Sequence, residues 1–165
     1  MSPAPSWTIR SLPVRIVVGV DGSPASLSAL RWAASEAQQR GAEVMAVRSW
    51  QDPPAPCTIA ARHPTLDRER ERARRALARD VRAVLGPAPA ARVHQELAYG
   101  HPARNLLHLA AKAAVLVLGD APTDRGPVRT ACLRMSPCPV VLVPPDPPAP
   151  TIPTASRRPM TRASD

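Results

Sequence analysis

Short, mainly apolar stretches recur along the chain and predict its strands. Four of them are "RIVVGV" (15–20), "AEVMAVRSW" (42–50), "AVLVLG" (114–119) and "PVVLVP" (139–144). The unbroken hydrophobicity of the first and third is typical of strands buried on both faces, as in a parallel sheet. A fifth stretch, "ARVHQELAYG" (91–100), alternates apolar and polar residues, which predicts a strand nearer an edge of the sheet.

The segments between these strands carry a helical period. After the first strand, Ser23 predicts an N-cap, Pro24 a first helical residue and Gly41 the end of the helix. Residues 65–86 repeat an apolar stripe beside arginines and acids, which favours a solvated amphipathic helix with ion pairs. Shorter helices are expected over 101–114 and 127–135. Five strands and four helices predict an α/β fold, a doubly wound five-stranded parallel sheet.

Open sheets of this class bind ligands beyond the carboxyl ends of their strands, where the strand order reverses. With the common order 3-2-1-4-5, that crevice lies between the first and fourth strands. The chain leaves those two strands through "DGS" (21–23) and "GDAPTDRG" (119–126). Ser49 and Trp50 end the second strand and border the same place. Topology alone therefore selects these segments as a candidate ligand site.

Three blocks of the sequence resemble the opening, middle and closing parts of the universal stress protein family. They are "RIVVGVDGSPASLSALRWAASEAQQRGAEVMAVRSW", "YGHPARNLLHLAAKAAVLVLG" and "MSPCPVVLVPP". The resemblance implies a Rossmann-like sheet of the adenine nucleotide alpha hydrolase-like class, with ATP or AMP in the crevice. It also implies a homodimer that forms through the last strand, between Pro139 and Pro144.

The resemblance gives roles to individual residues. In the nucleotide-binding branch of the family, the aspartate after the first strand contacts adenosine, and Asp21 holds that position here. A main-chain group near the end of the second strand recognises adenine, at about Ser49. The phosphates lie on a loop of the pattern G-x2-G-x9-G-[ST]. Gly119 matches its first glycine, Gly126 its last glycine, and Val128 the residue after the hydroxyl position.

The loop departs from that pattern. Only six residues separate Gly119 from Gly126, and Pro127 stands where the family has a hydroxyl residue. Phosphate binding at a helix start needs free N–H groups and no nearby negative charge. Pro127 has no N–H to donate, and Asp120 and Asp124 repel a polyphosphate.

Two arginines act in the opposite direction. Arg125 and Arg129 flank the loop and are placed to hold one phosphate in bidentate fashion. Taken together, these residues predict weak or lost adenine-nucleotide binding. A regulator that depends on bound ATP or AMP is the alternative.

The chain lacks the signatures of related adenine-binding enzymes. It has neither the HxGH motif of nucleotidyl transfer nor an SGGxDS pyrophosphate loop. Ser23 is interpreted as an N-cap rather than a nucleophile, because no obvious base accompanies it. His101 and His108 lack Cys or acidic partners at a supporting spacing, so no metal site is expected. We expect a non-catalytic stress-response or regulatory domain.

The charge of the chain raises a third hypothesis. Arg and Lys outnumber Asp and Glu by 22 to 13, a net charge of +9, with many arginines between Arg68 and Arg82. Such a balance suits a basic, nucleic-acid-associated protein. Aromatic residues make up only 2% of the chain, and the sequence offers no recognised binding motif or stacking surface. These observations argue against a nucleic-acid partner.

The cysteines and the ends of the sequence bear on location. Cys57, Cys132 and Cys138 form neither a CxxC pair nor an even disulfide framework, which favours a cytoplasmic protein with buried, inert thiols. No secretory signal is visible, and no apolar run approaches the roughly 20 residues of a membrane span. We interpret residues 1–13 as a flexible N-terminus, 14–145 as the domain, and 146–165 as a Pro-rich disordered tail.

Overall fold

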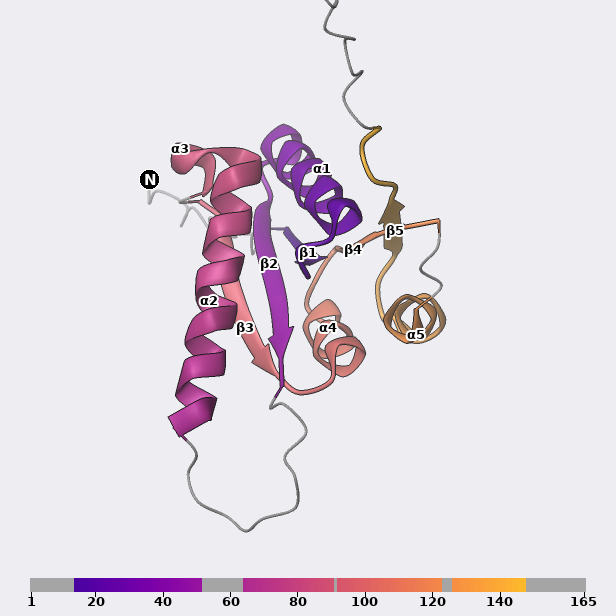
Figure 1. Cartoon of the computed structure of the whole chain (residues 1–165). Helices are drawn as coiled ribbons and strands as arrows, with labels where there is room; N and C mark the ends of the chain where they lie inside the picture. Colours follow the sequence, from indigo (N-terminus) through magenta and orange to yellow (C-terminus); the bar gives the residue numbers. More distant parts are fainter. Residues whose placement is uncertain (1–13, 52–63, 91, 123–125, 148–165) are drawn as a thin grey trace, which may run out of the picture.

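The computed structural model describes residues 14–51, 64–90, 92–122 and 126–147. Its five strands form one parallel sheet in the order β3-β2-β1-β4-β5 (Figure 1). The strands are β1 (Arg15–Gly19), β2 (Glu43–Trp50), β3 (His94–Tyr99), β4 (Val115–Gly119) and β5 (Val140–Val143). The predicted fold class and strand order are confirmed, including the edge position of β3.

The described helices are α1 (Pro24–Arg40), α2 (Pro64–Leu85), α3 (Pro87–Ala90), α4 (Pro102–Ala110) and α5 (Pro127–Met135). Four of them correspond to predicted helices. The single turn α3 is additional, because Gly86, with φ at 79°, ends α2 and Pro87 then begins a new helical turn.

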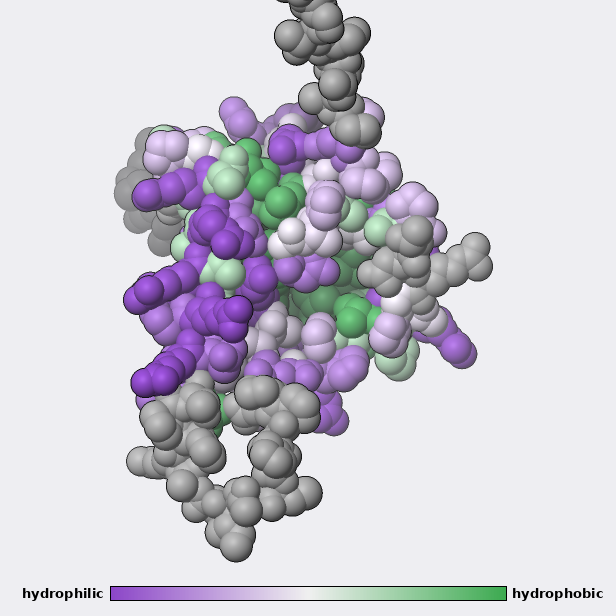
Figure 2. Space-filling view, in the orientation of Figure 1, coloured by the Kyte–Doolittle hydropathy of each residue, from purple (hydrophilic) through white to green (hydrophobic). Residues whose placement is uncertain are grey.

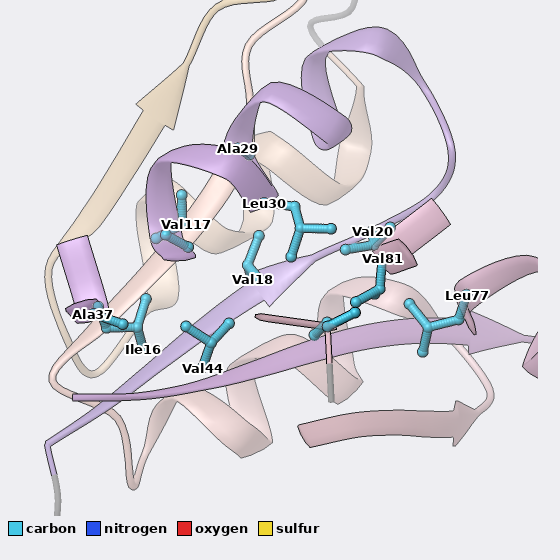
Figure 3. Close-up of a cluster of buried hydrophobic side chains, with 13 residues drawn as sticks. Ile16, Val18, Val20, Ala29, Leu30, Ala37, Val44, Leu77, Val81 and Val117 are labelled. Carbon is cyan, nitrogen blue, oxygen red and sulfur yellow. The ribbon is translucent and has the colours of Figure 1, made fainter. Parts of the chain in front are cut away.

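Two apolar layers hold the helices on the sheet. One joins α1 and α2 to one face through alternate strand residues such as Ile16 and Val18 (Figure 3). The other joins α4 and α5 to the opposite face through Val17, Leu116 and their neighbours. Because successive strand residues enter opposite layers, the central strands are apolar throughout.

The predicted helix signals operate as expected in α1. The Ser23 hydroxyl accepts a hydrogen bond from the Ser26 N–H at 3.2 Å, and Pro24 follows as the first helical residue. Gly41 ends the helix with φ at 62° and donates its N–H to Ala37 O. These local signals place the start of α1 beside the carboxyl ends of β1 and β4.

Helix α2 has the expected amphipathic form. Its buried stripe is Ala73, Leu77 and Val81, and its exposed side carries ion pairs such as those of Glu71 with Arg74 and Arg75. Figure 2 shows the hydrophilic side chains gathered along this helix.

Within the described part of the chain, no helix is long and apolar enough to cross a membrane.

Candidate functional site

A cavity of about 260 Å³ opens at the carboxyl ends of the central strands, where the topology predicts it. Residues leaving β1, β2 and β4 meet there with the first turns of α1, α4 and α5. Six of the seven residues predicted for the site line this cavity: Asp21, Ser49, Gly119, Gly126, Val128 and Arg129. The seventh, Arg125, lies outside the described residues, as does Asp124.

The turn from β1 into α1 is closed by its own hydrogen bonds. The Asp21 carboxylate accepts the Ser23 N–H at 2.8 Å, and the Ser26 hydroxyl accepts the N–H groups of Asp21 and Gly22. Ser26 Oγ in turn donates to Ser23 O at 3.0 Å. Four N–H groups of this turn, including that of Ser26 itself, therefore have internal partners.

The carboxylate of Asp21 is stabilised in its charged form. Burial raises its pKa, but the hydrogen bonds from Ser23 and Ser26 together outweigh burial, and the pKa lies below the ordinary value. Asp21 is thus an anionic acceptor beside the cavity at neutral pH. The Ser23 bond uses Oδ1, and a carboxylate can accept several hydrogen bonds, so Asp21 can also accept one from a ligand.

The end of β2 contributes Ser49, and its hydroxyl has a partner from another element. Asn105 of α4 donates its Nδ2 hydrogen to Ser49 Oγ at 3.1 Å. Next to it, Arg48 donates from Nη2 to the Asp21 carbonyl at 3.1 Å and from Nη1 to Asp80 of α2 at 2.9 Å. Asn105, Arg48 and Asp80 did not emerge from the sequence patterns, because their partners lie far along the chain.

Gly119 is required by packing. A Cβ atom at this position would lie 2.5 Å from Ala25 C and 2.6 Å from Ser26 N. Such distances are far inside van der Waals contact, and backbone atoms cannot move aside as a flexible side chain can. The first turn of α1 therefore approaches β4 closely only because residue 119 has no side chain.

The start of α5 offers few hydrogen-bond donors. Gly126 is the N-cap and has no side chain to cap the helix, and Pro127 follows without an N–H. The first backbone bond of the helix runs from Thr130 N to Gly126 O at 3.2 Å. The N–H groups of Gly126, Val128 and Arg129 have no partner within the helix and can serve a ligand.

The charges at the mouth of the cavity neutralise each other. Arg129 Nη2 lies 3.1 Å from Asp120 Oδ1, and both side chains are about one-third exposed or less. Among the described residues, Arg129 Nε is buried without a hydrogen-bond partner. Arg129, which was predicted to hold a phosphate, and Asp120, which was predicted to repel one, thus form an ion pair with each other.

Other candidates lie away from this site. No group of three or more His, Cys, Asp or Glu residues in the described ranges is placed to hold a metal ion. Trp50 and Tyr99 do not line the cavity and instead pack edge to face, with ring centroids 4.9 Å apart. Cys132 is fully buried, and burial raises the pKa of its thiol, as expected for an inert cysteine.

The fold and the site define a doubly wound α/β protein with a ligand crevice at the point where the strand order reverses. The model of the universal stress protein family matches residues 14–144, and the chain belongs to that family. A curated relative, a universal stress protein from Mycolicibacterium smegmatis, is 32% identical over 109 residues. The match covers 64% of this chain and 35% of the relative, so the chain spans about a third of that protein's length.

Solved structures carry the same fold. The universal stress protein UspA from Lactobacillus plantarum is 23% identical with a TM-score of 0.59, over 81% of this chain and 99% of that chain. The universal stress protein from Archaeoglobus fulgidus in complex with dAMP is 21% identical with a TM-score of 0.55, again over 81% and 99%.

Proposed function

We propose that this chain is a non-catalytic stress-response or regulatory domain whose crevice binds adenosine or AMP weakly. We refer to the loop between β4 and the start of α5, where the family resemblance places the phosphates, as the phosphate half of the site. In this proposal it does not hold a polyphosphate. The observation that carries the proposal is the ion pair between Arg129 and Asp120 at the mouth of the cavity. A cation that is already neutralised gives an incoming phosphate little net attraction.

The residues that we assign to adenosine have side chains suited to it. Asp21 presents a carboxylate that suits the hydroxyl groups of a ribose, and Ser49 lies at the end of β2 within the same wall. Val47, Leu106 and Leu118 add apolar surface for a purine ring. The Archaeoglobus relative in complex with dAMP supports this choice of ligand class.

The phosphate half is poor in donors. Pro127 removes one N–H from the first turn of α5, and the N–H groups at the start of α1 are engaged within their own turn. The volume of about 260 Å³ also lies below the roughly 300 Å³ at which small-molecule pockets begin. A nucleoside or monophosphate is therefore favoured over a triphosphate.

The test is whether the purified protein carries or takes up an adenine compound. Native mass spectrometry should show adenosine or AMP at low occupancy, and added AMP should raise Tm by a few degrees. Asp21→Asn should abolish this rise, whereas Asp67→Asn, an exposed residue of α2, should leave it unchanged. Co-purified ATP at high occupancy would instead establish a nucleotide-dependent regulator.

A second candidate function is a ligand-free dimeric scaffold. Strand β5 forms an edge of the sheet and is half-buried at every position. Leu133 and Met135 of α5, the helix that precedes β5 in the chain, are exposed by 48% and 62%. An apolar edge of this kind is usually covered. Sedimentation should give a dimer at micromolar concentration, and a monomer there would contradict the scaffold.

A further inference from the structure

Helix α2 carries an uninterrupted row of exposed arginines. Arg68, Arg72, Arg75, Arg79 and Arg82 are all exposed, and at 100° per residue they fall within about 80° of arc. We refer to these five residues as the arginine row. It runs about 20 Å along the helix at a rise of 1.5 Å per residue. Successive residues of the row are thus about 4.5 or 6 Å apart along the helix axis, a spacing that suits a chain of phosphates.

The acids of α2 flank the row and do not interrupt it. Glu71 pairs with Arg75, Glu69 with Arg72 at 4.0 Å, and Asp80 with Arg79. These arginine side chains remain 73% to 82% exposed, and exposed ion pairs of this kind contribute little free energy. The guanidinium groups can therefore exchange these partners for phosphates.

A groove of about 990 Å³ joins the row to the sheet. Four of the five row residues line it, and Arg48 of β2 lines it from the other side. Within the groove, arginines outnumber acids five to two, the acids being Asp67 and Glu71. The residues that line the groove therefore carry a net positive charge.

An aromatic pair lies on the same face of the sheet as Arg48. Side chains alternate along a strand, so Trp50 points to the side of Arg48, about 7 Å further along β2. Trp50 and Tyr99 are register partners, and their rings meet edge to face at 4.9 Å. Tyr99 is 58% exposed. Sequence alone did not reveal this surface, because the pairing of β2 with β3 creates it.

We propose that the arginine row, the groove beside it and the Trp50–Tyr99 pair together bind single-stranded nucleic acid. The arginine row follows the phosphate backbone, and Tyr99, supported by Trp50, stacks on a base. Single strands are recognised by this combination of a cationic groove and an aromatic platform. A duplex keeps its bases stacked inside and an acidic peptide has none, so neither uses Tyr99 in this way.

The binding experiment uses fluorescence anisotropy of a labelled oligothymidylate and the full chain at low salt. Replacing Arg72, Arg75 and Arg79 by Gln should weaken binding at least about tenfold. It should also reduce the slope of log K against log salt by about 2, since each phosphate contact contributes roughly 0.7 for a single strand. The matched control replaces Arg92, Arg104 and Arg134 by Gln, which changes the net charge equally. It should change Kd less than about threefold.

A second measurement tests whether a base stacks on Tyr99. Tyr99→Leu should weaken binding by about tenfold, the range found for base–aromatic stacking. Wild-type protein should lose a similar factor on an abasic strand, and Tyr99→Leu should bind the abasic and normal strands equally. Thermal melting of each variant shows that it is folded.

Three results would overturn the proposal. They are no binding at low salt, an equal loss in both arginine triples, and equal affinity for single strand and duplex. Displacement of the strand by poly-glutamate, with the same arginine dependence and no effect of Tyr99→Leu, would assign the arginine row to an acidic protein segment instead.

Discussion

Arg129, which lines the crevice, and Asp120 form an ion pair of 3.1 Å. Arg129 alone would attract a phosphate, and Asp120 alone would repel it. As a pair they leave little net charge beside the crevice. In the proposed function this pair is a reason for weak phosphate binding, and it can be tested by exchanging the two side chains one at a time.

Asp120→Asn should restore phosphate binding in part. Without the carboxylate charge, Arg129 becomes available to a ligand, and its charge-assisted hydrogen bond should raise the affinity for AMP about tenfold. Isothermal titration calorimetry measures this change. The control is Asp120→Asn with Arg129→Gln, which should lose the gain. An equal gain in both variants would show that the pair is not responsible.

Arg48 should be important for stability. Its guanidinium group, 19% exposed, satisfies Asp80, whose side chain is only 7% exposed. Arg48→Met leaves that carboxylate without its buried partner and should lower the free energy of unfolding by about 2–3 kcal/mol in urea. Arg79→Met removes the other, 73% exposed partner of Asp80 and should change it by less than about 1 kcal/mol. Equal effects of the two substitutions would contradict this assignment.

Gly119→Ala should be more costly than Gly19→Ala, although both glycines lie at the ends of central strands. At residue 119 the added methyl group meets backbone atoms of α1 at 2.5 Å. At residue 19 it meets leucine methyl groups at 3.2 and 3.4 Å, which can shift. We expect a loss of about 2–3 kcal/mol for Gly119→Ala and about 1 kcal/mol or less for Gly19→Ala, measured by urea unfolding. The reverse order would show that α1 does not pack so closely on β4.

The ionised Asp21 should stabilise the fold in a defined pH range. Its pKa in the folded chain lies below the ordinary value of 3.8, so its contribution is present above that pH and is lost as the pH falls through the folded pKa. The difference in unfolding free energy between wild type and Asp21→Asn should therefore shrink from pH 7 to pH 3. A constant difference over this range would contradict the hydrogen-bonded carboxylate.

The sequence predicts the strands, the first helix and the place of the crevice because local signals specify them. The apolar runs are buried on both faces, and Ser23, Pro24 and Gly41 bound α1 as expected. The order of the strands then brings Asp21, Ser49 and Gly119 to one cavity.

What the sequence did not predict depends on contacts between distant residues. Arg48 and Asp80 are 32 positions apart, and neither position carries a pattern that indicates the other. Asp120 and Arg129 were each assigned an effect on phosphate, but only side-chain geometry shows that they pair. The contact between Trp50 and Tyr99 likewise exists only because β3 lies in register with β2.

If the crevice holds adenosine but gains little from phosphates, adenosine, AMP and ATP should differ little in affinity for the wild-type protein. Titration calorimetry of the three ligands measures this. We expect weak binding of adenosine and AMP, with dissociation constants within about threefold of each other, and ATP binding no tighter than adenosine. ATP binding more than about tenfold tighter than adenosine would show that the phosphates are held, and would overturn the proposed function.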